Sequence, residues 1–157
     1  MPRSGPDVAL LLLAGFRTLV DAASSELAEL GYEDVRPVHD FALRAILGGA
    51  DTASELGRRT AVTKQAAAKT IAALEERGYV SREADPADRR RTRVLVTDRG
   101  RSMLTDGARI MDGLRDRWEE QVGPVALAAV EDALDALVGL DTVRPSSPGW
   151  VATDPSV

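Results

Sequence analysis

Apolar residues recur every three or four positions along most of this chain, which is the spacing of an amphipathic helix. Glycines interrupt the pattern at positions 31, 48, 49, 78 and 123, and each interruption marks the end of a predicted helix. Six helices are expected, over residues 7–30, 37–47, 52–59, 63–78, 97–122 and 125–140.

The first predicted helix is apolar over more than one face. One helical stripe carries Leu12, Phe16, Leu19, Ala23 and Leu27. Leu10, Leu11 and Leu13 widen the apolar surface beyond that stripe, and Asp7 is expected to cap the helix. A helix that is apolar on more than one side needs a second packing partner, so we expect this one in a subunit interface.

The middle of the chain carries the signals of a helix-turn-helix unit. Pro37 suits the first turn of a helix, because its missing amide hydrogen needs no partner there. Thr52 and Glu55 form a capping box that opens a short helix. After a tight turn, Thr63 is expected to cap a longer helix. Two such helices joined by a tight turn are typical of this motif.

Apolar and polar residues alternate over residues 79–84 and 92–97, which is the period of a half-buried strand. Pro86 lies between the two runs, where it interrupts no ladder of hydrogen bonds. Leu95 falls on the nominally polar face, and the alternation gives no reason for it. The expected fold class is therefore mainly α with one small β-hairpin.

After the hairpin, apolar residues recur near every seventh position of a long helix, at Leu104, Met111 and Trp118. The last helix carries a stripe of Leu127, Val130, Leu134 and Leu137. Residues 141–157 are rich in Pro, Ser, Thr and Gly, and we expect them to be disordered.

Charge is distributed unevenly along the chain. The whole chain has 20 Lys and Arg against 25 Asp and Glu, a net charge of -5, which by itself argues against nucleic acid. Residues 58–101, here named the basic island, hold 12 Lys and Arg and 6 Asp and Glu, a net of +6. The remaining residues have 8 against 19, a net of -11. A polyanion would therefore meet a local positive field.

Several classes of function are disfavoured by what the sequence lacks. With no cysteine and one histidine, neither thiolate chemistry, nor a dedicated metal site, nor a cofactor is expected. The chain has no phosphate-binding loop with its lysine and no Gly-x-Ser-x-Gly elbow, so an enzyme is not expected. No run approaches the roughly 20 apolar residues of a spanning helix, so a soluble, cytoplasmic protein without membrane contact is expected.

The helix predicted over residues 63–78 has one face suited to reading DNA. The inner face carries Ala67, Ile71 and Leu74, and the outer face carries Gln65, Ala68, Lys69, Ala72 and Glu76. The alanines make the outer face thin enough for a major groove about 12 Å wide, where Gln65 can pair with an adenine edge. Thr63 and Lys64 lie at the positive helix end, which favours phosphate. The alternative is an ordinary surface helix, because alanine is simply a good helix former.

The hairpin tip concentrates positive charge. Four guanidinium groups lie within five residues, on Arg89, Arg90, Arg91 and Arg93. Binding to a polyanion would relieve their repulsion by releasing counterions, and a narrow minor groove attracts an inserted guanidinium. Asp85 and Asp88 can orient one of these arginines. The alternative is a solvated run of charge without a partner.

Residues 85–100 resemble the wing signature of the MarR family of bacterial transcription regulators. Their sequence is Asp-Pro-Ala-Asp-Arg-Arg-Arg-Thr-Arg-Val-Leu-Val-Thr-Asp-Arg-Gly. Together with Thr63-Lys64-Gln65 and residues 74–80, they extend the resemblance over about residues 37–100. The resemblance implies a dimeric winged helix-turn-helix. Its parts would be an N-terminal dimerisation helix over residues 7–34, a DNA-binding domain over 35–100 and C-terminal dimerisation helices over 101–140.

The resemblance also implies roles for single residues. Asp88 would position a wing arginine, and Arg90 would reach the minor groove. The major groove would be faced by Thr63, Lys64, Gln65 and Lys69. Arg89 and Arg91 complete the expected DNA contacts.

Members of the family often bind small aromatic effectors between the dimer helices and the DNA-binding lobe. His39 and Trp118 are the candidates for such a role in this chain. A structural or exposed histidine, and a core or interface tryptophan, are the alternatives.

The leading hypothesis is a homodimeric repressor that binds double-stranded DNA at a near-palindromic operator and is released by a small-molecule effector. Two recognition helices would enter successive major grooves about 34 Å apart. The alternative is a winged helix used as a protein-interaction module, in which the basic wing contacts an acidic partner without sequence-specific DNA binding.

Overall fold

The structure is a computed structural model, and it describes residues 3–139. Its elements follow the chain as α1 (Gly5–Glu29), α2 (Pro37–Leu47), α3 (Ala53–Thr60), α4 (Lys64–Glu76), β1 (Val80–Ala84), β2 (Thr92–Val96), α5 (Asp98–Val122) and α6 (Pro124–Val138). The predicted fold class is confirmed, with the helices and the hairpin in the predicted order. The tail that was expected to be disordered lies outside the described residues.

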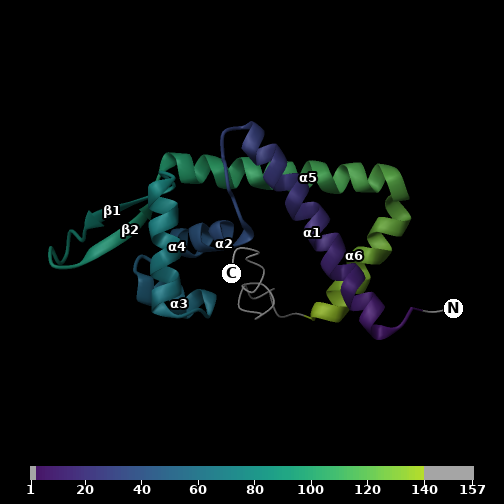
Figure 1. Cartoon of the computed structure of the whole chain (residues 1–157), viewed down its shortest axis with the longest axis horizontal. Helices are drawn as coiled ribbons and strands as arrows, with labels where there is room; N and C mark the ends of the chain where they lie inside the picture. Colours follow the sequence, from purple (N-terminus) through teal and green to yellow (C-terminus); the bar gives the residue numbers. More distant parts are fainter. Residues whose placement is uncertain (1–2, 140–157) are drawn as a thin grey trace.

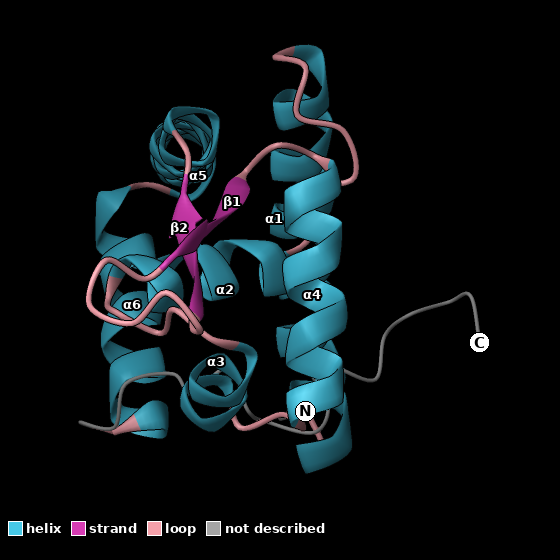
Figure 2. Cartoon of the chain, turned by 90° about the vertical axis from the view of Figure 1, so that its left-hand side faces the viewer, coloured by secondary structure: helices cyan, strands magenta, loops and turns pink. Residues whose placement is uncertain are grey.

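The helix-turn-helix and the hairpin lie at one end of the molecule, and α6 lies at the other (Figure 1). The long helix α5 runs between the two ends, and α1 packs against it and crosses it at an angle. Figure 2 looks at the hairpin end, where β1 and β2 lie in front of α2 and α4 stands beside them. The basic island is therefore displayed at one end, away from α6.

The start of α1 differs from the prediction. Ser4, and not Asp7, is the N-cap. The Asp7 carboxylate accepts a hydrogen bond from the Ser4 N–H at 3.2 Å, and the Ser4 hydroxyl accepts one from the Asp7 N–H at 3.3 Å. The helix begins earlier because Pro6 is tolerated in a first turn, where its missing N–H costs nothing.

Only the C-terminal part of α1 is buried. Ala23 and Leu27 belong to the core, whereas Leu10 and Leu11 are exposed. Among residues 3–139, α1 is the one helix that is long and apolar enough to cross a membrane by length and composition alone. The sequence prediction considered unbroken apolar runs, whereas α1 is apolar on average although Arg17 interrupts its apolar residues.

Thr52 and Thr63 cap α3 and α4 as predicted. The Thr52 hydroxyl accepts a hydrogen bond from the Glu55 N–H at 3.2 Å. The other half of the predicted capping box is wrong, because the Glu55 carboxylate accepts hydrogen bonds from Arg58 and Arg59 instead. Bonds from a guanidinium to a carboxylate are stronger than one from a neutral amide, which explains the preference.

The turn between α3 and α4 depends on two backbone positions. A Cβ atom on Gly57 would lie 2.9 Å from the Val62 carbonyl oxygen, so the chain can close this tightly only around glycine. Ala61 has a φ of 51°, in the left-handed region that reverses the chain direction. These two positions set the angle at which α4 leaves α3.

The hairpin is an antiparallel pair with Val80 opposite Val96 and Ser81 opposite Leu95. Val80, Val94 and Val96 are buried against the helices. Leu95, which the alternation left unexplained, is half-buried beside Ser81 on the other face.

The end of α4 is joined to the start of α5 around Tyr79. A Cβ atom on Gly100 would lie 2.3 Å from the Tyr79 carbonyl oxygen, so only glycine allows α5 to approach this closely. The Arg99 guanidinium lies over the rings of Tyr32 and Tyr79, at 5.4 and 5.5 Å from their centroids. It also donates a hydrogen bond to the Gly31 carbonyl at 2.8 Å. The Arg99 junction, as we name this contact, thereby connects α4, α5 and the segment before α2.

Candidate DNA-binding surface

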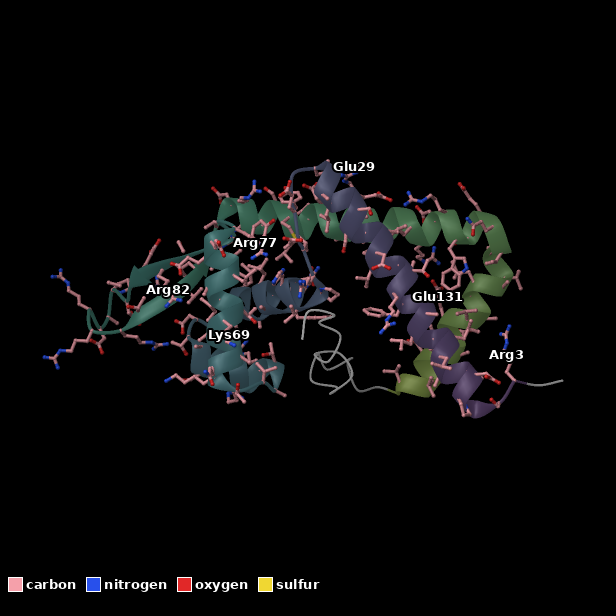
Figure 3. The ribbon with its side chains drawn as sticks, viewed as in Figure 1. Arg3, Glu29, Lys69, Arg77, Arg82 and Glu131 are labelled. Atoms are coloured by element: carbon pink, nitrogen blue, oxygen red, sulfur yellow. The ribbon has the colours of Figure 1, made fainter. Side chains whose placement is uncertain are left out.

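The two faces of α4 are as predicted. Ala67, Ile71 and Leu74 are buried in the core. Gln65 and Lys69 are exposed on the outer face, and Lys69 is labelled on α4 in Figure 3. Thr63 and Lys64 are exposed at the start of the helix. The first turn therefore presents backbone N–H groups and a lysine to solvent, an arrangement suited to a phosphate.

Two aspartates shape the backbone of the wing tip. The Asp85 carboxylate accepts a hydrogen bond from the Ala87 N–H at 2.9 Å, and the Asp88 carboxylate accepts one from the Arg90 N–H at 3.0 Å. The Asp85 N–H donates to the Arg91 carbonyl at 2.8 Å and closes the loop. Aspartate commonly stabilises turns through such bonds to the second residue after it.

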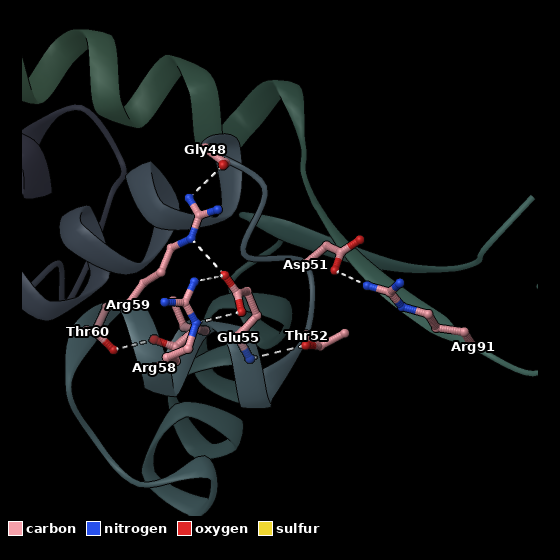
Figure 4. Close-up of polar contacts among 9 residues, drawn as sticks. Gly48, Asp51, Thr52, Glu55, Arg58, Arg59, Thr60 and Arg91 are labelled. Atoms are coloured by element: carbon pink, nitrogen blue, oxygen red, sulfur yellow. Dashed lines mark hydrogen bonds and ion pairs between the residues drawn. The ribbon is translucent and has the colours of Figure 1, made fainter. Parts of the chain in front are cut away.

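Asp88 therefore contacts an arginine through the backbone of Arg90. Within the described wing tip, the guanidinium that carboxylates hold is that of Arg91. It lies 3.8 Å from Asp85 and 2.6 Å from Asp51, a residue between α2 and α3 (Figure 4). The sequence analysis missed Asp51, because 40 residues separate it from Arg91 and no local pattern connects them.

Apart from Arg91 and Arg99, whose contacts are described above, the cations of the basic island fall into two groups. Glu55 binds Arg58 and Arg59, Glu75 binds Arg82, and Asp34 lies near Arg77. The pKa of the Glu55 carboxyl is lowered to about 2, chiefly by hydrogen bonds from Arg58 and then from Arg59. These arginines therefore hold the helix-turn-helix lobe together, and their charge is largely matched.

The second group has no carboxylate partner. Among the described residues, no side-chain hydrogen bond or ion pair is made by Lys64, Lys69, Arg89, Arg90, Arg93 and Arg101. Four of these six are predicted DNA contacts, at the start and outer face of α4 and at the wing tip. Unmatched, exposed cations are the groups that gain most from a polyanion, because they release its counterions.

His39 is buried in the described structure, and its exposed fraction is 6%. Its Nδ1 accepts a hydrogen bond from the Arg36 N–H at 3.2 Å. Burial, followed by the charges of Arg77 and Arg36, lowers the pKa of the imidazole to about 4. This environment is that of a neutral, structural histidine, which was the alternative to an effector contact.

A largely apolar cavity of ≈ 310 Å³ lies where α1, α2 and α5 meet. Its lining includes Val20, Leu27, Phe41, Met103 and Met111. The ion pair between Arg44 and Asp40, at 2.7 Å, contributes polar atoms to it. Neither His39 nor Trp118 lines this cavity. Its lining comes from three helices that are distant in sequence, so periodicity within one helix could not reveal it.

No group of three or more potential metal ligands occurs within residues 3–139. The chemistry that this end of the molecule offers is electrostatic attraction and hydrogen bonding toward a polyanion. A helix-turn-helix followed by a basic two-stranded wing and flanked by long helices is the architecture of winged helix-turn-helix regulators.

Residues 37–91 match the model of the MarR family. Over 79 residues it is 34% identical to the uncharacterized HTH-type transcriptional regulator YcgE of Bacillus subtilis (strain 168). That alignment covers 47% of this chain and 51% of YcgE, so the chain spans about half the length of this curated relative.

Solved structures show the same fold at low sequence identity. CouR from Rhodococcus jostii RHA1, bound to p-coumaroyl-CoA, is similar with a TM-score of 0.57 and 22% identity, over 87% of this chain and 95% of that one. A MepR mutant of S. aureus bound to an oligodeoxyribonucleotide is similar with a TM-score of 0.60 and 16% identity, over 83% and 95%.

The environment of His39 predicts a pH dependence of stability. The unfolded chain binds a proton at His39 below its ordinary pKa of 6.5, whereas the folded chain does so only near pH 4. The free energy of unfolding should therefore fall as the pH decreases through this interval, by up to about 3 kcal/mol from this group. His39→Asn keeps an acceptor for the Arg36 N–H and does not titrate, so its stability should depend less on pH. Urea unfolding of both proteins across the interval measures the difference, and equal pH dependence would contradict a neutral His39.

Proposed function

We propose that this protein is a homodimeric, cytoplasmic transcription regulator that binds a near-palindromic operator and acts as a repressor released by a small effector. The observation that carries the proposal is the division of the basic island into matched and unmatched cations. Most of the matched ones, Arg58, Arg59, Arg82 and Arg91, are held by carboxylates within residues 51–75. The unmatched ones include Lys64, Lys69, Arg89 and Arg90.

Each unmatched group suits a different part of a DNA duplex. α4 would enter the major groove, with Gln65 facing a base edge and Thr63, Lys64 and Lys69 facing phosphates or base edges. The wing would lie along the flanking minor groove, where Arg90 and its neighbour Arg89 meet the negative potential. A solved structure of this fold, that of the MepR mutant, is bound to an oligodeoxyribonucleotide, which supports a DNA partner for this chain.

Arg90→Ala and Gln65→Ala should affect DNA binding in different ways. Loss of Arg90 should weaken binding to all sequences and reduce the log-log slope of affinity against salt by about one. Loss of Gln65 should relax the base preference at one position in each half-site. Gel shifts at several salt concentrations, on duplexes that the wild type selects from a random pool, measure both effects.

Arg82→Ala is the matched control, because Arg82 lies at the base of the same hairpin and is paired with Glu75 at 2.9 Å. It should change affinity and slope little. If both test variants bind as tightly and selectively as the wild type, the proposed DNA contacts are wrong. If the wild type selects no sequence, the protein-interaction module becomes the better explanation.

A dimer is supported by exposed apolar side chains on α1 and α6. Leu10 and Leu11 are 64% and 52% exposed on α1, and Val125 and Leu137 are 84% and 69% exposed on α6. Apolar surface of this extent marks an interaction site, and closed twofold symmetry is the common way to cover it. The two copies of α4 would then be spaced for successive major grooves.

Leu11→Glu should dissociate the dimer. In a twofold interface both copies lose a buried leucine, at about 2 kcal/mol each and about 4 kcal/mol together, so the dissociation constant should rise by roughly a thousandfold. Ser25→Glu is the control, since Ser25 is an exposed polar residue on the same helix. Sedimentation velocity measures both, and an unchanged oligomeric state for Leu11→Glu would exclude this face of α1 from the interface.

An effector site is supported by the cavity between α1, α2 and α5. Its volume of ≈ 310 Å³ suits a small aromatic molecule, and it borders both the outer helices and the helix-turn-helix. A ligand there would alter the position of α2 relative to α5, and with it the spacing of the recognition helices. The structure of CouR, bound to p-coumaroyl-CoA, supports ligand binding within this fold.

Gly107→Leu tests this site, because Gly107 lines the cavity and a Cβ atom there has nothing within 4 Å. In a thermal-shift screen of phenols and aromatic carboxylates, ligands should raise the melting temperature of the wild type and not of this variant. Gly113→Leu is the control on the same helix, with Arg117 Nη1 at 3.7 Å from its Cβ position as an ordinary contact. Ligands that stabilise both variants equally would place the site elsewhere.

A further inference from the structure

We propose that Asp51 is a positioning residue for DNA binding, which holds the wing through Arg91, and that Arg91 is therefore not itself a DNA contact. This inference rests on the proposed function. It assigns a role to a residue that no sequence motif indicated, and it removes Arg91 from the set of groups expected at the DNA.

Asp51 contacts the wing in two ways. Its backbone carbonyl accepts a hydrogen bond from the Val94 N–H at 2.7 Å, in the middle of β2. Its carboxylate Oδ1 accepts a hydrogen bond from Arg91 Nη2 at 2.6 Å, at the end of the tip (Figure 4). Val94 and the neighbouring Ala50 are buried, so the backbone contact is part of the core. The backbone that carries the Asp51 carboxylate is therefore held in place by the core.

The Arg91 guanidinium is drawn toward the helix-turn-helix by this contact. Its second amino group lies 3.8 Å from Asp85, so two carboxylates face it from different segments. Arg89 and Arg90 have no such partner among the described residues. One arginine of the tip thus sets the direction of the wing, and the two before it remain available to DNA.

Within residues 3–139, only the pair with Asp51 ties a side chain of the tip to the helix-turn-helix, because Asp85 and Asp88 bond within the tip itself. The side chains of Asp51 and Arg91 are 25% and 50% exposed, so solvent weakens the pair without removing it. Wing and α4 must meet adjacent grooves together, so holding their relative position before binding reduces the ordering cost of the complex.

The direction in which DNA affinity changes when Asp51 is replaced distinguishes a positioning role from a purely electrostatic one. Asp51 carries a negative charge beside the surface proposed to bind DNA. If its only effect were electrostatic repulsion of the phosphates, removing the charge should tighten DNA binding. If Asp51 positions the wing, its removal should weaken binding. In a protein that already lacks Arg91 there is no contact to lose, and the substitution should then leave affinity unchanged or raise it.

The experiment uses the full chain and a duplex that the wild type selects from a random pool. Asp51→Ala and Arg91→Ala should each weaken binding about twofold to fivefold, the range expected for one partly exposed pair. The double variant should bind no more weakly than Arg91→Ala. The salt slope should stay unchanged in Arg91→Ala and fall by about one in Arg90→Ala. Asp51→Asn, which keeps the acceptor but not the charge, should fall between the wild type and Asp51→Ala.

Three results would overturn the inference: tighter or unchanged binding by Asp51→Ala, additive losses in the double variant, or a slope for Arg91→Ala reduced by one. The last would make Arg91 a phosphate contact. Circular dichroism of each variant at the binding temperature verifies folding, and Arg91→Ala, at a half-exposed position, tests the inference even if Asp51→Ala unfolds. A wild type that selects no duplex would overturn the proposed function, and this inference with it.

Discussion

The end of the molecule that carries the helix-turn-helix and the hairpin depends on how charge is matched within the basic island, whose net charge is +6. Mutual repulsion would oppose folding if all of its cations were free. Glu55, Glu75 and Asp51 each hold an arginine that lies within or beside the helix-turn-helix. Each carboxylate joins neighbouring turns or segments, so the ion pairs that neutralise charge also hold the structure together. The cations left over include Lys64, Lys69, Arg89 and Arg90, whose exposed side chains have no carboxylate partner among the described residues.

The other constraint is the close contact between the start of α5 and the end of α4. Gly100 allows the backbones to touch, and Arg99 fills the space between two tyrosine rings while it hydrogen-bonds to Gly31. The core of the helix-turn-helix is therefore continuous with the long helix that carries α6. The cavity between α1, α2 and α5 is lined in part by residues of this same long helix. A molecule bound in it would contact both the outer helices and the lobe that carries α4.

Local signals predicted most of the fold. Thr52, Thr63 and Thr97 each cap the helix that they precede, because a hydroxyl that accepts a hydrogen bond from a free backbone amide stabilises the start of a helix. The predictions that were wrong concern competition between partners. Asp7 is not the cap because the helix already begins at Gly5, where the Ser4 hydroxyl accepts a hydrogen bond from the Asp7 N–H. The side chain of Glu55 does not return to the backbone because two guanidinium groups lie within reach.

The sequence by itself determined the helices, the hairpin, the inner and outer faces of α4 and the location of the excess positive charge. These properties follow from the periods of helix and strand and from the order of charged residues, which are local. Only the tertiary structure decided which cations are matched, that Asp51 meets Arg91, that His39 is buried and that three helices enclose a cavity. These contacts join residues far apart in the chain, and their energies depend on distance and burial, which no local pattern encodes.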